Sequence, residues 1–113
     1  MRLTDRAEEL AAEIRAEDAT IQVVTDPAHV LANLPCVLVT PPRVDYVARA
    51  ITWRLVVVAG GPGTWAGFQA LDQLLEKLAA VVPLDSAEPN QLQLPNVGDP
   101  VAAYTATYTD TQL

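Results

Sequence analysis

The chain has 113 residues, half of them apolar, and a formal net charge of −7. This length is enough for one compact domain and too short for two, so we expect a single domain over residues 1–113. The acidic balance argues against a nucleic-acid-binding protein, which normally carries a basic face. No lysine or arginine follows Lys77, so the C-terminal third would be repelled by phosphates.

Cysteine content and hydropathy exclude further classes. Cys36 is the single cysteine, so the chain has no internal disulfide, and its apolar neighbours predict that it is buried. The longest apolar run, Leu55–Ala59, is too short to span a membrane. Residues 1–18 lack the apolar core of a signal peptide. We therefore expect a soluble protein, made in the cytoplasm and without a membrane partner.

The N-terminal segment, residues 1–18, predicts an amphipathic helix from Leu3 to Glu17. Its apolar residues recur at spacings of three and four, and charged residues cover the other face. Thr4 or Asp5 is placed to cap the helix start. Next, Ile21–Val23 predicts a short strand.

A short helical turn and two strands follow. Asp26 and Pro27 predict an N-cap and a first helical position, with the turn running to Asn33. Residues 36–39 form a buried strand that Pro41 and Pro42 should end, because proline cannot donate to a sheet ladder. The alternating pattern of residues 44–59 predicts one long strand, whose first part forms a projecting hairpin with residues 41–45.

The second half predicts one main helix and two more strands. The helix runs from about Thr64 to Val81, with a short strand at Gln91–Leu94, a loop over 95–100 and a last strand at Val101–Thr109. The fold class is therefore α+β, with a mixed, largely antiparallel sheet of four to five strands and two main helices packed on one face. The predicted apolar face of the helix contains Phe68, Leu71, Leu75, Leu78 and Val82.

The strand, glycine-rich turn and helix of residues 51–67 have the order of a nucleotide-binding loop. A phosphate loop needs lysine and Ser/Thr after its glycines, whereas Gly67 is followed by Phe68. The dinucleotide pattern G-x-G-x-x-G fails by one position at Ala66, and Pro62 removes a backbone donor. These glycines predict a tight turn, and we expect no cofactor.

Catalytic and metal-binding constellations fail in the same way. One histidine, His29, and one cysteine cannot build a zinc site within one chain. Ser86, the single serine, lacks a nucleophile elbow. Asp72 and Glu76 lie one turn apart on a polar helix face, where they would be solvated. We expect no catalytic residue and no metal ligand, hence no enzyme.

The order of the motifs resembles that of a phage structural family. The relevant segments are Leu34–Val39, Trp53–Val58, Gly60–Pro62, Leu71–Leu78, Ala87–Pro89 and Pro100–Thr109. Together they resemble the tail terminator proteins of long-tailed (siphovirus-type) phages, especially those of actinobacterial hosts. The resemblance spans roughly residues 20 to 109.

This resemblance implies a homo-oligomer, a hexameric ring, located in the virion at the head–tail junction. Such a ring caps the tail tube, ends its elongation and joins the tail to the head. Its partners would be the major tail tube protein and a head-closure or connector protein. DNA would pass through the lumen without specific binding, and an acidic wall would offer its phosphates no counterions.

The projecting segment around residues 41–49 is the predicted contact region. Arginine is enriched at interfaces, so arginines near this segment are candidates to meet acids of a neighbouring chain. The candidate contacts to a neighbouring subunit or to the tube are Arg43, Asp45, Tyr46, Arg49 and Arg54.

Two other hypotheses stay open. The chain would be a head-closure or head–tail adaptor protein of the same connector, which gene neighbourhood would separate from a terminator. Alternatively, it would be a small cytoplasmic ligand-binding or enzyme domain that uses the turn of residues 60–67. That hypothesis predicts thermal stabilisation by nucleotide.

Overall fold

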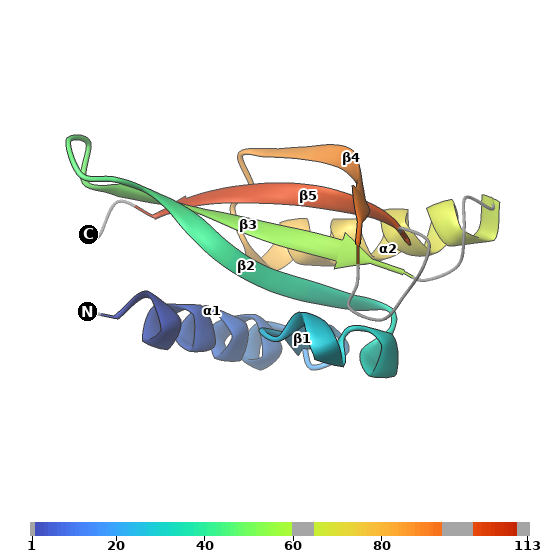
Figure 1. The fold of residues 1–113 in the computed structure, drawn as a ribbon. Helices are drawn as coiled ribbons and strands as arrows, with labels where there is room; N and C mark the ends of the chain where they lie inside the picture. The colour runs from blue at the N-terminus through green and yellow to red at the C-terminus, as the bar shows by residue number, and fades with distance from the viewer. Residues whose placement is uncertain (1, 60–64, 94–100, 111–113) are drawn as a thin grey trace.

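The computed structural model describes residues 2–59, 65–93 and 101–110, with the backbone alone for Leu31. Two α-helices and a five-stranded mixed sheet make up this part of the chain, which confirms the predicted α+β class (Figure 1). The elements are α1 (Leu3–Glu17), β1 (Val23–Val24), the 3₁₀ turns η1 (Pro27–His29) and η2 (Leu31–Asn33), β2 (Cys36–Asp45), β3 (Ala50–Val58), α2 (Trp65–Val81), β4 (Ser86–Leu92) and β5 (Val101–Asp110).

The strands lie in the order β1-β2-β3-β5-β4. β1 runs parallel to β2, and the other neighbouring pairs are antiparallel. The long β3 lies at the centre of the sheet, paired with β2 on one side and β5 on the other. β4 forms one edge, where Pro89 is tolerated because this strand pairs with β5 alone.

Both helices cover the same face of the sheet, as the sequence predicts. Side chains alternate along a strand, so every second residue of β3 from Ile51 to Val57 points to the helices. α1 and α2 place their apolar stripes on this layer, and burial of the stripes is the main force that holds the helices on the sheet. The helix residues of this core are Leu10, Ala11, Ile14, Leu71, Leu74 and Leu78.

Among the described residues, a second apolar cluster covers one end of the opposite face. There the segment that contains η1 and η2 buries Val30 against Cys36 and Leu38 of β2 and Val56 of β3. Cys36 is fully buried, which confirms its predicted burial. The rest of this face carries polar side chains from β2, β3, β4 and β5.

The predicted end of β2 at Pro41 and Pro42 is wrong. β2 continues to Asp45, and its register against β3 shifts between Thr40 and Arg43. Since Thr40 pairs with Arg54 and Arg43 with Thr52, the two prolines together oppose a single β3 residue, which is a β-bulge. On its other side, β2 pairs with β1 only at residues 37 and 38. Pro41 and Pro42 therefore have no partner strand there that would need a backbone N–H from them.

The predicted single strand over residues 44–59 is also wrong, because a turn at residues 46–49 divides it. The sequence offers no glycine there. Instead, the Asp45 carboxylate accepts the backbone N–H groups of Val47 at 3.1 Å and Ala48 at 3.0 Å. Arg49 then adopts a φ of 55°, which reverses the chain. The predicted hairpin is confirmed, with its tip four residues later than the prolines suggested.

Several smaller boundaries differ from prediction. α1 spans Leu3–Glu17 as predicted, but Arg2 is its N-cap residue and makes no side-chain cap, so the predicted caps at Thr4 and Asp5 are wrong. The first strand lies later, at Val23–Val24. The Asp26 cap is confirmed by a hydrogen bond from the Ala28 N–H.

In the second half, β4 begins earlier than predicted, at Ser86. Pro83 follows α2, which ends at Val81 as predicted, although Phe68 of its expected apolar face is 48% exposed. The glycine turn before Trp65 and the loop at residues 95–100 lie outside the described residues.

Candidate assembly surfaces

The β2–β3 hairpin extends beyond the rest of the sheet (Figure 1). β3 pairs with β5 only from Ile51 onward, so the turn at residues 46–49 lies past the last of these pairs. At the turn, the Tyr46 side chain is 79% exposed and Val47 is 98% exposed. We call residues 45–49 the hairpin tip.

Four of the five predicted contact residues lie together in this hairpin. Arg43 and Asp45 end β2, Tyr46 begins the turn and Arg49 closes it; all four are exposed. Arg54 is also exposed but lies farther along β3. It shares the open face of the sheet with Arg43, because Arg43 pairs with Thr52, two residues before Arg54.

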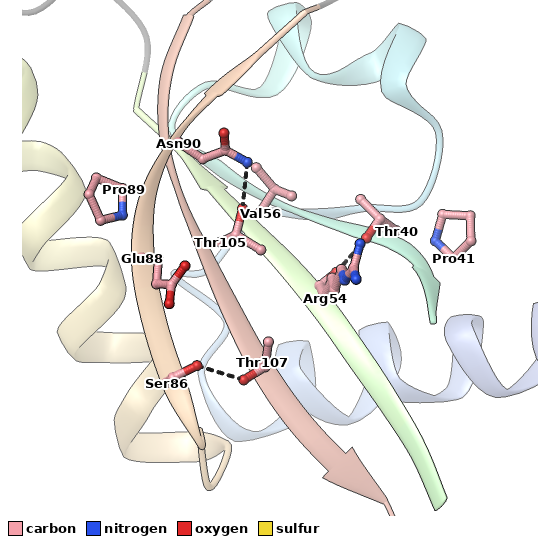
Figure 2. Close-up of a pocket in the computed structure, with 10 residues that line it drawn as sticks. All are labelled: Thr40, Pro41, Arg54, Val56, Ser86, Glu88, Pro89, Asn90, Thr105 and Thr107. Atoms are coloured by element: carbon pink, nitrogen blue, oxygen red, sulfur yellow. Dashed lines mark hydrogen bonds between the residues drawn. The ribbon is translucent and has the colours of Figure 1, made fainter. Parts of the chain in front are cut away.

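Arg54 borders a shallow polar depression of about 680 Å³ on this open face (Figure 2). The hydroxyls around it have hydrogen-bond partners, among them the Arg54 carbonyl oxygen, which accepts from Thr40 Oγ1 at 2.8 Å. Ser86 Oγ and Thr107 Oγ1 lie 2.9 Å apart, and Asn90 Nδ2 donates to Thr105 Oγ1 at 3.2 Å. This arrangement pairs Ser86 with a threonine hydroxyl. The predicted site residues include Arg54 but no other residue of this surface. The sequence signal that could have identified it is the alternation of threonines in residues 105–109.

An apolar groove lies on the helix side of the bulge, between the N-terminal half of α1 and β2. We call it the α1–β2 groove; its volume is about 440 Å³. Its lining is mainly apolar, with the acidic Glu8 among the few polar groups. Sequence reasoning missed the groove because it depends on where the bulge meets a helix distant in sequence. The lining residues are Leu3, Thr4, Ala7, Glu8, Thr25, Val39, Thr40, Pro41, Pro42 and Trp53.

A partly buried ion pair fixes the helix that forms one wall of this groove. Arg6 of α1 donates from Nε to the Asp110 carboxylate at 3.1 Å, and its Nη2 lies 3.1 Å from the same oxygen. The side chains of Arg6 and Asp110 are only 14% and 8% exposed. Arg6 also contacts the exposed Glu13 at 3.1 Å. The pair joins the first helix to the last strand.

Reactive groups are few in the described part of the chain. Burial raises the pKa of the Cys36 thiol to about 11, so the thiol is protonated at neutral pH. Within residues 2–59, 65–93 and 101–110, no three His, Cys, Asp or Glu side chains gather as metal ligands would. Asp72 and Glu76 are exposed on α2, and His29 is exposed in η1.

Two further findings bear on the class of protein. None of the helices in the described segments is long and apolar enough to cross a membrane. No protein-family model, curated protein or solved structure matches the chain.

Proposed function

We propose that this chain is a structural virion protein whose copies form a ring at the end of a phage tail tube. The ring ends tube elongation and joins the tail to the head. One structural observation supports this most directly: the hairpin projects from the sheet and exposes Tyr46 and Val47 at its tip. Large apolar side chains gathered on a projecting element are typical of a contact with another protein.

The ring is a closed assembly with heterologous contacts, in which one surface of each copy meets a different surface of the next. The motif resemblance implies six copies, with the major tail tube protein on one side and a head-closure protein on the other. The hairpin projects beyond the rest of the sheet, and it carries Arg43 and Arg49 beside its apolar tip.

DNA passes through the lumen of this ring without specific binding. The strands β4 and β5 support this part of the proposal, because they carry neither lysine nor arginine and expose the acid Glu88, while Asp110 is buried against Arg6. A lumen lined by such strands would not exchange its counterions for DNA phosphates. A basic lumen in the assembled ring would contradict this assignment.

The proposal assigns no enzymatic activity. In the depression on the open face, the Ser86 hydroxyl lies against the Thr107 hydroxyl, and Cys36 is buried and protonated. Neither arrangement supplies an activated nucleophile with an adjacent base.

Tube polymerisation tests the function directly. The major tail tube protein encoded beside this chain is polymerised alone and with added chain, and tube lengths are measured by electron microscopy. We expect shorter tubes that stop growing when the chain is present, because capped ends accept no further subunits. Unchanged lengths would contradict a terminator, and binding only to isolated head connectors would identify the adaptor instead.

A further inference from the structure

We propose that the hairpin tip of one copy inserts into the α1–β2 groove of a second copy. This inference deepens the proposed function, and it rests on that function for the closure of the contacts into a ring. It identifies the two surfaces that meet: Tyr46 and Val47 on the tip, and the apolar lining between α1 and β2 on the neighbour.

The tip and the groove have matching chemistry. Val47 is 98% exposed and Tyr46 is 79% exposed, so the apolar surface of both side chains is in contact with water. Covering that surface with another apolar surface is favourable. The groove presents Leu3, Ala7 and Pro42 as an uncovered apolar lining. A groove of about 440 Å³ has room for side chains of this size.

The tip cannot fill the groove of its own chain. Pro41 and Pro42 line the groove and also lie in β2, the strand that leads away to the tip. An extended strand advances about 3.3 Å per residue, so Val47 lies on the order of 15 Å beyond Pro42. A hairpin tip that enters this groove must therefore belong to another copy.

Charge favours a second copy as the occupant of the groove. The hairpin contributes the exposed arginines Arg43 and Arg49 beside the single acid Asp45, whereas the described lining of the groove contains the exposed acid Glu8 and no basic residue. The chain as a whole carries −7, so two copies repel unless positive residues of one meet acids of the other. The contact between the hairpin and α1 places positive residues of one copy against an acid of the other. This charge complementarity determines which surfaces meet.

The tip and the groove are different surfaces of the chain, so the contact can repeat head-to-tail around a ring or be exchanged between two copies, and the proposed function requires the first arrangement. Each copy has one tip and one groove, and both lie toward the same side of the molecule, near the N-terminal end of α1 (Figure 1). Repeated tip-in-groove contacts join copies into a closed ring, whereas mutual exchange would stop at a pair.

Cysteine cross-linking tests the contact. One full-length variant carries Val47→Cys, and a second carries Thr4→Cys in the groove lining. The native Cys36 does not interfere, because it is fully buried and its thiol pKa is about 11. The two variants are mixed across a concentration series, in solution and with tail tubes, and are then oxidised mildly. Gln73→Cys on the exposed face of α2 replaces Thr4→Cys in the control mixture.

We expect disulfide-linked dimers of Val47→Cys with Thr4→Cys and at least tenfold fewer with Gln73→Cys. A single chain that carries both Val47→Cys and Thr4→Cys should give a ladder of linked species that ends at the closed ring. No preference for the groove cysteine, in solution or on tubes, would overturn the proposal. A ladder that stops at the dimer would overturn the ring arrangement and leave a paired exchange.

Charge reversal gives an independent variant. Arg49→Glu should reduce cross-linking of Val47→Cys to Thr4→Cys several-fold, and Glu8→Arg on the partner should restore it. Failure of the restoration would contradict the pairing of the hairpin with α1.

These results separate the contact from the function. Rings on tube ends without the preferred cross-link would remove the contact and keep the proposed function. The preferred cross-link without any effect on tubes would keep the contact and remove the tail function.

Discussion

Asp110 is the single buried charged residue in the described part of the chain, and Arg6 neutralises it. Because both side chains are largely shielded from water, their hydrogen bonds are worth more than those of an exposed pair. Loss of one partner leaves the other charge poorly solvated. The pair therefore holds α1 against β5, and with it one wall of the α1–β2 groove.

Asp110→Asn should lower the free energy of unfolding by about 2 kcal/mol, because it removes the charge that Arg6 faces. Urea unfolding monitored by circular dichroism measures this loss. Glu9→Gln is the matched control: Glu9 lies 3.5 Å from Arg6, but its side chain is 62% exposed, so we expect little change. Equal losses for the two variants would contradict the assigned role of Asp110.

Cys36 should be inert toward thiol reagents in the folded protein. Its side chain is fully buried against Val30 and Leu38, and burial raises its thiol pKa to about 11. At pH 8 the thiol is therefore protonated and shielded, and reaction should follow only unfolding. Labelling kinetics with and without denaturant measure this. Rapid labelling of the folded chain would show that the cover formed by η1 and η2 opens readily.

Arg49 closes the hairpin turn with a φ of 55°, a region that disfavours side chains with a Cβ. Arg49→Gly should therefore raise the free energy of unfolding by up to about 1 kcal/mol. Ala48→Gly, at the neighbouring position without a positive φ, should lower it by about 0.5 kcal/mol. Chemical denaturation compares the two variants, and a loss of stability in Arg49→Gly would contradict the turn geometry. We also expect Arg49→Gly to associate less strongly, because the proposed contact uses this arginine.

At the scale of elements, α2 shows how far periodicity alone can predict packing. The predicted stripe is buried at Leu71 and Leu78, whereas Phe68 is nearly half exposed and contacts Trp65 edge-on, with ring centroids 5.5 Å apart. Phe68 lies in the first turn of the helix, where fewer core residues face it. The spacing of apolar residues predicts which face of a helix packs on the sheet. It does not predict how much of the helix length the sheet covers.

Leu78→Ala should lower the free energy of unfolding by about 3 kcal/mol, because Leu78 is fully buried and its truncation leaves a cavity. Phe68→Ala should cost about 1 kcal/mol, mainly through the lost contact with Trp65. Thermal and urea unfolding of the two variants provide the comparison. A larger loss for Phe68→Ala would show that the exposed end of α2 is covered in solution.

The β2–β3 hairpin explains which boundaries the sequence could not predict. Proline was expected to end β2, because it has no N–H to donate. Pro41 and Pro42 instead lie in a bulge, where β2 does not need those N–H groups for its hydrogen bonds to β3. The turn lacks glycine, and an Asp45 carboxylate with two backbone N–H groups replaces it. An aspartate two and three residues before those N–H groups was the available signal. Sequence rules identify which residue types can end a strand or form a turn. The pairing of β2 with β3 determines where the strand ends and the turn forms.

The contact residues divide along the same line. That the candidates Arg43, Asp45, Tyr46 and Arg49 lie together on a hairpin could be predicted, because a projecting segment is local in sequence. Arg54 was placed with them, but strand pairing sets it on the open polar face of the sheet. The α1–β2 groove could not be predicted, since one wall is a bulge in β2 and the other is a helix that the long-range pair of Arg6 and Asp110 holds against β5.

At the scale of the whole molecule, the chain has different chemistry on its different surfaces. The hairpin carries exposed apolar side chains and arginines, α1 carries acids beside an apolar groove, and β4 with β5 exposes Glu88 and hydroxyls without lysine or arginine. A domain with complementary surfaces that its own chain cannot bring together is suited to head-to-tail assembly. In the proposed ring, the hairpin and groove join the copies, and β4 and β5 are available to line the lumen.

Electron microscopy of the protein mixed with tail tubes tests the central claim most directly. The account predicts a ring at one end of each tube, with Val47→Asp abolishing the rings and the exposed helix variant Gln73→Asp preserving them. Tubes that carry no ring at either end, or chain bound along their sides, would contradict it.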